Sequence, residues 1–210
     1  MKKTLFLAAS LCFATFAQAQ LMSEPSDYPL DELNPKIKTE GEIQLVKSWD
    51  DANGANFLIV SRTADYEKYD KETEQNAQNA ELYVYHYTLN EMGQYKLLRK
   101  ITDYVKACPL DMTLAFQDES LKITDLDKDG TAEITFVYRL ACRGDVSGAE
   151  QKLMLLENGE KYAIRGTCGR KLGESVEKPT MTMGDEFRKV PKALQEHAKK
   201  VWKKFEYEEF

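Results

Sequence analysis

Histidine and paired cysteines are scarce in this sequence. Only two histidines, His86 and His197, occur among 210 residues. The sequence therefore offers few imidazoles for a Ser-His-Asp triad or for a zinc site. The four cysteines form no C-x-x-C pair, which argues against a metal site with thiolate ligands. These absences favour a binding or structural protein over an enzyme.

Long apolar runs are confined to the N-terminus. Lys2 and Lys3 precede the run LFLAASLCFATFA, which leads to the small-x-small cleavage site Ala17-Gln18-Ala19. This order is typical of a secretory signal peptide, so we expect residues 1–19 to be removed and the product to lie in the periplasm or to be secreted. Cys12 follows a bulky leucine where a lipoprotein signal has a small residue, and we expect it to leave with the signal.

The remaining chain lacks both a membrane span and an excess of positive charge. No later stretch approaches the roughly 18 apolar residues that a transmembrane helix needs. Loss of the two signal lysines takes the formal net charge from −6 to −8, which disfavours nucleic acid and anionic membrane as partners. We expect an extended, proline-containing lead-in over residues 20–41 and a single domain over residues 42–210.

The strongest chemical signal is an acidic loop inside the segment ITDLDKDGTAEITFVYRL, residues 123–140. Alternate carboxylates, a turn glycine, a backbone carbonyl and a further carboxylate follow one another at the positions that supply hard oxygen ligands in calcium loops. The sequence therefore predicts one structural Ca²⁺, and the predicted ligands are Asp125, Asp127, Asp129, the Thr131 carbonyl and Glu133.

This loop departs from an EF-hand. Phe136 occupies position 12, where an EF-hand has a bidentate glutamate, and the flanks LKIT and ITFVY favour strands over helices. The pattern D-x-D-x-D-G-x-x-E before a strand resembles the aspartate-rich loops of FG-GAP or VCBS-like repeats, which implies a calcium loop between strands. An acidic hairpin turn without a metal is the alternative, because Asp and Gly are also ordinary turn residues.

The chain shows signs of an internal repeat. WDDANGANFLIV and TDLDKDGTAEITFVY share an acidic loop, a glycine turn and an outgoing apolar strand, and each is followed by a second strand and a tight turn. We therefore predict a mainly β fold of antiparallel, propeller-like meanders in two diverged repeats. Apolar residues at helical spacing add a C-terminal amphipathic helix over residues 191–205.

Three cysteines remain after the signal. Cys108 and Cys142 both begin C-x-x-D units and lie 34 residues apart. In an exported protein this favours a disulfide between them, which leaves Cys168 unpaired. The other two pairings among the three cysteines stay open at this point.

Two further patterns suggest weaker binding or catalytic sites. Alternation along a strand places Tyr83, Tyr85 and Tyr87 on one face, where they would stack on sugar rings or, as the alternative, pack within the sheet. A carboxylate pair such as Asp111 and Asp145 would be the starting point of a carbohydrate-active enzyme. The tripeptide Arg-Gly-Asp that ends at Asp145 is interpreted as a turn beside a structural cysteine.

A wider resemblance links the chain to the bacterial envelope. The order of C-x-x-D, DLDKDGTAE, VYRLAC, GDVS and EKYAIRG between residues 42 and 168 resembles an uncharacterised family of exported Gram-negative proteins filed under surface polysaccharide biosynthesis. That resemblance implies an envelope polysaccharide or an envelope protein as partner, and it specifies no reaction. We therefore expect an exported, calcium-stabilised binding or structural module.

Overall fold

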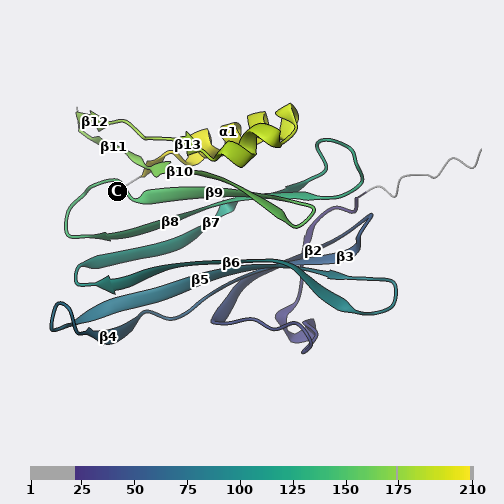
Figure 1. Cartoon of the computed structure of the whole chain (residues 1–210), viewed down its shortest axis with the longest axis horizontal. Coiled ribbons are helices and arrows are strands. Elements are labelled where there is room, and N and C mark those ends of the chain that lie inside the picture. Colours follow the sequence, from purple (N-terminus) through teal and green to yellow (C-terminus); the bar gives the residue numbers. More distant parts are fainter. Residues whose placement is uncertain (1–21, 174, 209–210) are drawn as a thin grey trace, which may run out of the picture.

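The computed structural model describes residues 22–173 and 175–208, so the predicted signal peptide lies outside the described residues. Antiparallel strands dominate the described chain, and one α-helix follows them near the C-terminus (Figure 1). The mainly β class and the C-terminal helix are thus confirmed. The helix, α1, spans Lys192–Phe205, and Pro191 is its N-cap residue.

The first sheet comes from the N-terminal half of the chain. Strands β1, β2, β3 and β5 are neighbours in that order, and β4 and β6 also pair with β5. The bounds are β1 Ser26–Asp27, β2 Glu42–Asp51, β3 Gly54–Arg62, β4 Tyr66–Asp70, β5 Gln75–Leu89 and β6 Tyr95–Cys108. The polar segment at residues 64–80 forms β4 and the start of β5. The main chain pairs there in an antiparallel ladder although β4 is mostly exposed.

The second sheet comes from the C-terminal half and has the order β13-β10-β9-β8-β7. Its hairpin at Asn158 and Gly159 has positive φ at both residues, as an Asn-Gly turn requires. The bounds are β7 Asp111–Thr124, β8 Glu133–Arg143, β9 Glu150–Glu157, β10 Glu160–Thr167 and β13 Thr182–Met183.

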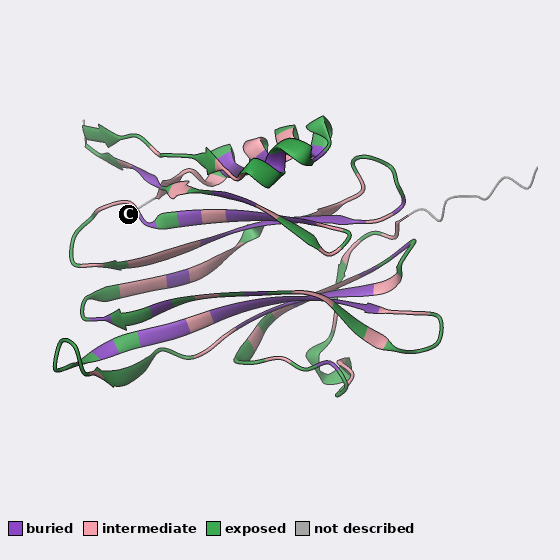
Figure 2. Cartoon of the chain, viewed as in Figure 1, coloured by how far each residue is buried: buried purple, intermediate pink, exposed green. Residues whose placement is uncertain are grey.

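The two sheets pack face to face. Leu58 and Val84 of the first sheet share one apolar core with Phe136 and Met154 of the second, and each of these side chains is at most 2% exposed. Figure 2 shows the buried residues concentrated on the strands of both sheets. The strands therefore form two stacked sheets in the described part of the chain, and not the propeller-like arrangement expected from the sequence. Each predicted repeat supplies a four-stranded meander to one sheet, β2-β3-β5-β6 or β7-β8-β9-β10.

Both outer faces are covered as well. Leu194 and Trp202 of α1 pack on Leu153 of the second sheet, and the 3-10 helix η2, Asp185–Lys189, adds Phe187 to the same cluster. The lead-in contains the 3-10 helix η1, Leu30–Glu32, and lies on the outer face of the first sheet (Figure 1). The molecule is therefore a stack of lead-in, sheet, sheet and helix.

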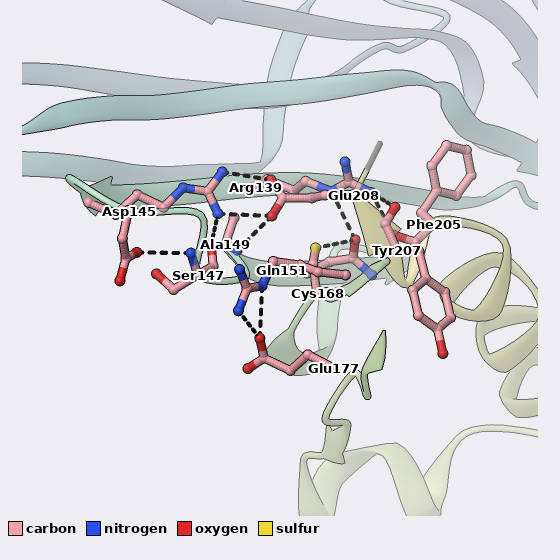
Figure 3. Close-up of polar contacts among 12 residues, drawn as sticks. Arg139, Asp145, Ser147, Ala149, Gln151, Cys168, Glu177, Phe205, Tyr207 and Glu208 are labelled. Atoms are coloured by element: carbon pink, nitrogen blue, oxygen red, sulfur yellow. Dashed lines mark hydrogen bonds and ion pairs between the residues drawn. The ribbon is translucent and has the colours of Figure 1, made fainter. Parts of the chain in front are cut away.

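The C-terminal segment is anchored to the second sheet by arginines (Figure 3). Arg143 donates two hydrogen bonds of 2.9 Å to the Glu208 carboxylate, and Arg139 donates to the carbonyls of Phe205 and Tyr207. A small third sheet completes the anchor, with the order β12-β11-β14. Its strands are β11 Gly169–Leu172, β12 Ser175–Glu177 and β14 Tyr207–Glu208.

The predicted disulfide between Cys108 and Cys142 is confirmed, with a Cα–Cα distance of 5.5 Å. Cys168 is free and buried, and its thiol donates to Gln151 Oε1 at 3.4 Å. Burial raises the pKa of the Cys168 thiol to about 11, so this thiol is neutral near pH 7.

Candidate metal centre

The acidic loop connects β7 to β8, and its backbone turns sharply before β8 begins. Lys128 and Gly130 both have positive φ, 62° and 88°. Glycine takes this conformation without steric cost, whereas a lysine held there needs support from its surroundings. Asp127 and Asp129 flank Lys128, and the Asp129 N–H donates to Asp127 Oδ1 at 3.3 Å. The loop therefore folds back on itself and gathers its carboxylates.

Three carboxylates of the loop meet. Asp125, Asp127 and Glu133 each offer an oxygen atom, and these oxygens all lie within 4.8 Å of one another. Asp125 Oδ2 accepts the Gly130 N–H at 3.2 Å, whereas Asp125 Oδ1 is buried without a hydrogen-bond partner among the described residues. A buried acceptor without a donor is costly. A cation between the three side chains would satisfy it.

Glu133 is the most buried member of the group, with 2% of its surface exposed. Its carboxylate accepts hydrogen bonds from the Thr124 hydroxyl at 3.3 Å and the Leu126 N–H at 3.0 Å. Burial, together with the neighbouring charge of Asp127, raises the pKa of Glu133 to about 7 although the hydrogen bond from the Leu126 N–H lowers it. The ionised form of the Glu133 carboxylate is therefore disfavoured near neutral pH, and a bound cation would stabilise it.

Asp129 is not one of these three carboxylates, and its side chain instead contacts Thr131. Asp129 Oδ1 accepts the Thr131 N–H at 2.7 Å and its hydroxyl at 2.5 Å. These hydrogen bonds from Thr131 hold the pKa of Asp129 below its ordinary value. The structure thus brings together three of the predicted carboxylates and gives the fourth a role in closing the turn.

A carboxylate outside the loop also faces the group. Glu157 is the last residue of β9, one step beyond the ladder pair Ile134–Leu156, so it lies opposite Glu133. Burial first, and then the charges of Asp127 and Asp129, raise the pKa of Glu157. Like charges placed directly across a ladder destabilise it. The sequence did not single out Glu157, because the register between β8 and β9 joins segments separated by an irregular loop.

The acidic loop is braced by the hairpin between β2 and β3. The Ala52 N–H donates to the Gly130 carbonyl at 2.8 Å. The Ala132 N–H donates to Asp51 Oδ2 at 3.1 Å, and the same oxygen accepts the Trp49 indole N–H at 3.0 Å. Asp51 is only 2% exposed. A buried carboxylate in the first meander therefore holds the point where the acidic loop enters β8.

The tyrosine stripe lies within a packed cluster. Tyr83, Tyr85 and Tyr87 are at most 8% exposed and pack against the lead-in. The Tyr87 hydroxyl donates to the Lys38 carbonyl at 2.8 Å, and the Tyr85 hydroxyl accepts the Glu40 N–H at 2.9 Å. The rings therefore take the packing role, which was the alternative to stacking on sugars.

The remaining candidates are an exposed carboxylate pair and a buried histidine. Asp111 and Asp145 are both exposed, and hydrogen bonds from Ser147 hold the pKa of Asp145 below its ordinary value. A general acid needs the opposite shift. His86 is buried, stacks on Trp49 and contacts Asn56 Oδ1 at 3.0 Å, so it is part of the core.

No protein-family model, curated protein or solved structure matches the chain. Across residues 22–173 and 175–208, no helix combines the length and the apolar character that a bilayer crossing demands.

Proposed function

We propose that the protein is an exported β-rich envelope protein, stabilised by one Ca²⁺, that serves as a binding or structural module linked to surface glycans. The observation that carries the calcium part is the convergence of Asp125, Asp127 and Glu133 within 4.8 Å around a carboxylate that is 2% exposed. Burying ionised carboxylates together is unfavourable unless a cation or a proton compensates them.

The donor set favours calcium over other divalent cations. All three carboxylates offer hard oxygen atoms, and neither histidine nor cysteine belongs to the group, which disfavours zinc. Magnesium retains several waters and demands octahedral geometry, whereas calcium accepts irregular sets of six to eight oxygens. Three carboxylates, completed by backbone carbonyls or water, would suit the calcium requirement. We expect a dissociation constant of about 10⁻⁴ to 10⁻³ M, the range of extracellular calcium modules.

The proposed role of the ion is structural. Glu133 is the first residue of β8, and its neighbours Ile134 and Phe136 are fully buried in the core between the sheets. An ion that fixes Glu133 therefore fixes where β8 begins. Binding would add to the folding free energy, because the unfolded chain does not hold the three carboxylates together.

The envelope part of the proposal rests on the predicted signal peptide and on the resemblance to exported proteins filed under surface polysaccharide biosynthesis. The partner would be an envelope polysaccharide or an envelope protein. We do not advance the alternative of a carbohydrate-active enzyme, because Asp111 and Asp145 are both exposed and the pKa of Asp145 is lowered, which is the opposite of the shift that acid catalysis needs. Binding on a glycan array without turnover would support the module, and hydrolysis of the bound glycan would contradict it.

Calcium titration followed by thermal unfolding tests the metal assignment. We expect the melting temperature of the wild type to rise with calcium concentration, because a ligand that binds only the folded state stabilises it. Asp127→Ala should lose this response. An equal rise in both proteins, or no rise in the wild type, would contradict the assignment.

A further inference from the structure

The two hairpins that meet at the acidic loop are built alike. Asp51 lies three residues before Gly54, as Asp127 lies three residues before Gly130, and both glycines have positive φ, 101° and 88°. In each hairpin the aspartate Oδ1 accepts the N–H of the residue two positions later, at 2.8 Å and 3.3 Å. Asp51 is therefore the counterpart of Asp127 in the first meander.

The inward-facing residues follow the same count. Leu58 lies four residues after Gly54, Ile134 lies four residues after Gly130, and both are fully buried in the core between the sheets. The strands that leave the two hairpins thus present equivalent positions to one core. The correspondence covers the turn, the local hydrogen bond and the packing of the outgoing strand.

The two aspartates have nevertheless acquired different partners. Asp127 meets Asp125 and Glu133. Asp51 accepts hydrogen bonds from the Trp49 indole and from the backbone N–H groups of Asn53 and Ala132. Three N–H donors satisfy a buried carboxylate without any cation, so Asp51 has no need of a metal.

We propose that Asp51 is a positioning residue for the calcium loop and that it couples ion binding to Trp49. This inference rests on the proposed calcium site. Ala132 immediately precedes Glu133, so the hydrogen bond from its N–H to Asp51 fixes the backbone from which the most buried ligand projects. The Ala52 to Gly130 hydrogen bond fixes the other side of the same turn. A bound ion that moves Glu133 toward Asp125 and Asp127 also shifts this backbone. Asp51 Oδ2 accepts hydrogen bonds from both the Ala132 N–H and the Trp49 indole, so the shift reaches the indole through Asp51.

Trp49 is a natural reporter for this coupling. Its ring is 3% exposed and stacks on His86 at 5.4 Å between centroids, so small shifts in its hydrogen bond to Asp51 alter its fluorescence. The second tryptophan, Trp202, belongs to α1 and lies in a separate apolar cluster. Trp202→Phe isolates the Trp49 signal, and Trp49→Phe isolates that of Trp202.

The first experiment titrates calcium into these two variants and follows tryptophan fluorescence beside calorimetric binding. We expect Trp202→Phe to bind calcium with a saturable fluorescence change whose midpoint matches the calorimetric dissociation constant. Trp49→Phe should show no such change. Calcium binding without a Trp49 response would overturn the coupling and leave the calcium site standing. Absence of calorimetric binding to the wild type would overturn both proposals. This experiment leaves Asp51 intact and so decides the coupling whether or not substitutions at Asp51 fold.

The second experiment compares Asp51→Asn with Asp50→Asn in the Trp202→Phe background. Both substitutions remove one negative charge, but Asp50 is exposed and only Asp51 accepts the Ala132 N–H. We expect Asp51→Asn to lower calcium affinity about tenfold and to reduce the fluorescence change, and Asp50→Asn to stay within twofold of its parent. Equal affinities and equal fluorescence changes in the two variants would overturn the role assigned to Asp51.

Discussion

Cys108 and Cys142 form a disulfide that joins the two sheets. Cys108 ends β6 in the first sheet, and Cys142 lies in β8 of the second, where its ladder partner is Met112 of β7. The bond therefore links the two sheets and does not join neighbouring strands of one sheet. It closes the end of the molecule at which the chain passes from one meander to the next.

Reduction of this bond should destabilise the protein. The sequence separation of its cysteines is 34, and closing a loop of that length contributes about 3 to 4 kcal/mol in the chain-entropy model. Denaturant unfolding of the wild type with and without reductant should show a loss of this size. The Cys108→Ser/Cys142→Ser variant is the control and should be insensitive to reductant. Equal unfolding midpoints for oxidised and reduced wild type would contradict the assigned contribution.

The fold was predictable where local patterns determine it. Asn158 and Gly159 specify a tight hairpin because both accept positive φ, and the apolar spacing of Leu194, Ala198 and Val201 predicts a helix with one buried face. Sheet stacking was not predictable, because an apolar strand face such as that of β8 shows only that something covers it. Local patterns likewise did not predict β4, whose polar strand is held by backbone pairing with β5.

Acid should destabilise the protein through His86. Burial lowers the pKa of His86 from 6.5 to about 4, so between these values the unfolded chain binds a proton that the folded chain does not. The contribution of neutral His86 is fully present above about pH 6.5 and is lost as pH falls toward 4, by roughly 3 kcal/mol in all. His86→Phe keeps a ring against Trp49 and removes the titration.

The measurement is the free energy of unfolding from denaturant curves between pH 4 and pH 7. Carboxylates contribute the same pH dependence to both proteins, so the difference between wild type and His86→Phe isolates the histidine. We expect the wild type to lose stability more steeply below pH 6.5. Parallel curves would show that folding does not lower the pKa of His86.

The sequence predicted the ligand chemistry of the candidate site but only part of its geometry. The alternate aspartates predict oxygen ligation, and Asp125, Asp127 and Glu133 do converge. The hydrogen bonds that turn Asp129 toward Thr131 depend on the exact path of the turn, which the pattern does not encode. The hydrogen bond between Asp51 and the Ala132 N–H depends on the packing of two hairpins separated by more than 70 residues in sequence. Local sequence patterns do not predict a contact of that kind.

Glu157→Gln should stabilise the protein without calcium and reduce the stabilisation that calcium adds. Without calcium, removing the Glu157 charge relieves its repulsion with Asp127 and Asp129 and should stabilise the fold by about 0.2 to 1 kcal/mol. With saturating calcium the lost charge weakens attraction to the ion, so the stabilisation by calcium should be smaller than in the wild type. Glu160→Gln is the control, because Glu160 is exposed and lies within 3.7 Å of Arg99. Identical calcium responses in Glu157→Gln and the wild type would contradict this electrostatic role.

The predicted ligands should divide into two classes when calcium affinity is measured by calorimetry. Asp125→Asn replaces a carboxylate whose Oδ1 is buried without a hydrogen-bond partner among the described residues, and we expect at least a tenfold loss of affinity, equivalent to about 1.4 kcal/mol. Asp129→Asn retains an oxygen that can accept from Thr131, as Asp129 Oδ1 does, and should lose less than threefold. The two substitutions remove the same charge from the same loop, so simple electrostatics would give them equal losses. A larger loss for Asp129→Asn would show that Asp129 turns away from Thr131 to bind the ion, and would reverse the ranking that the structure implies.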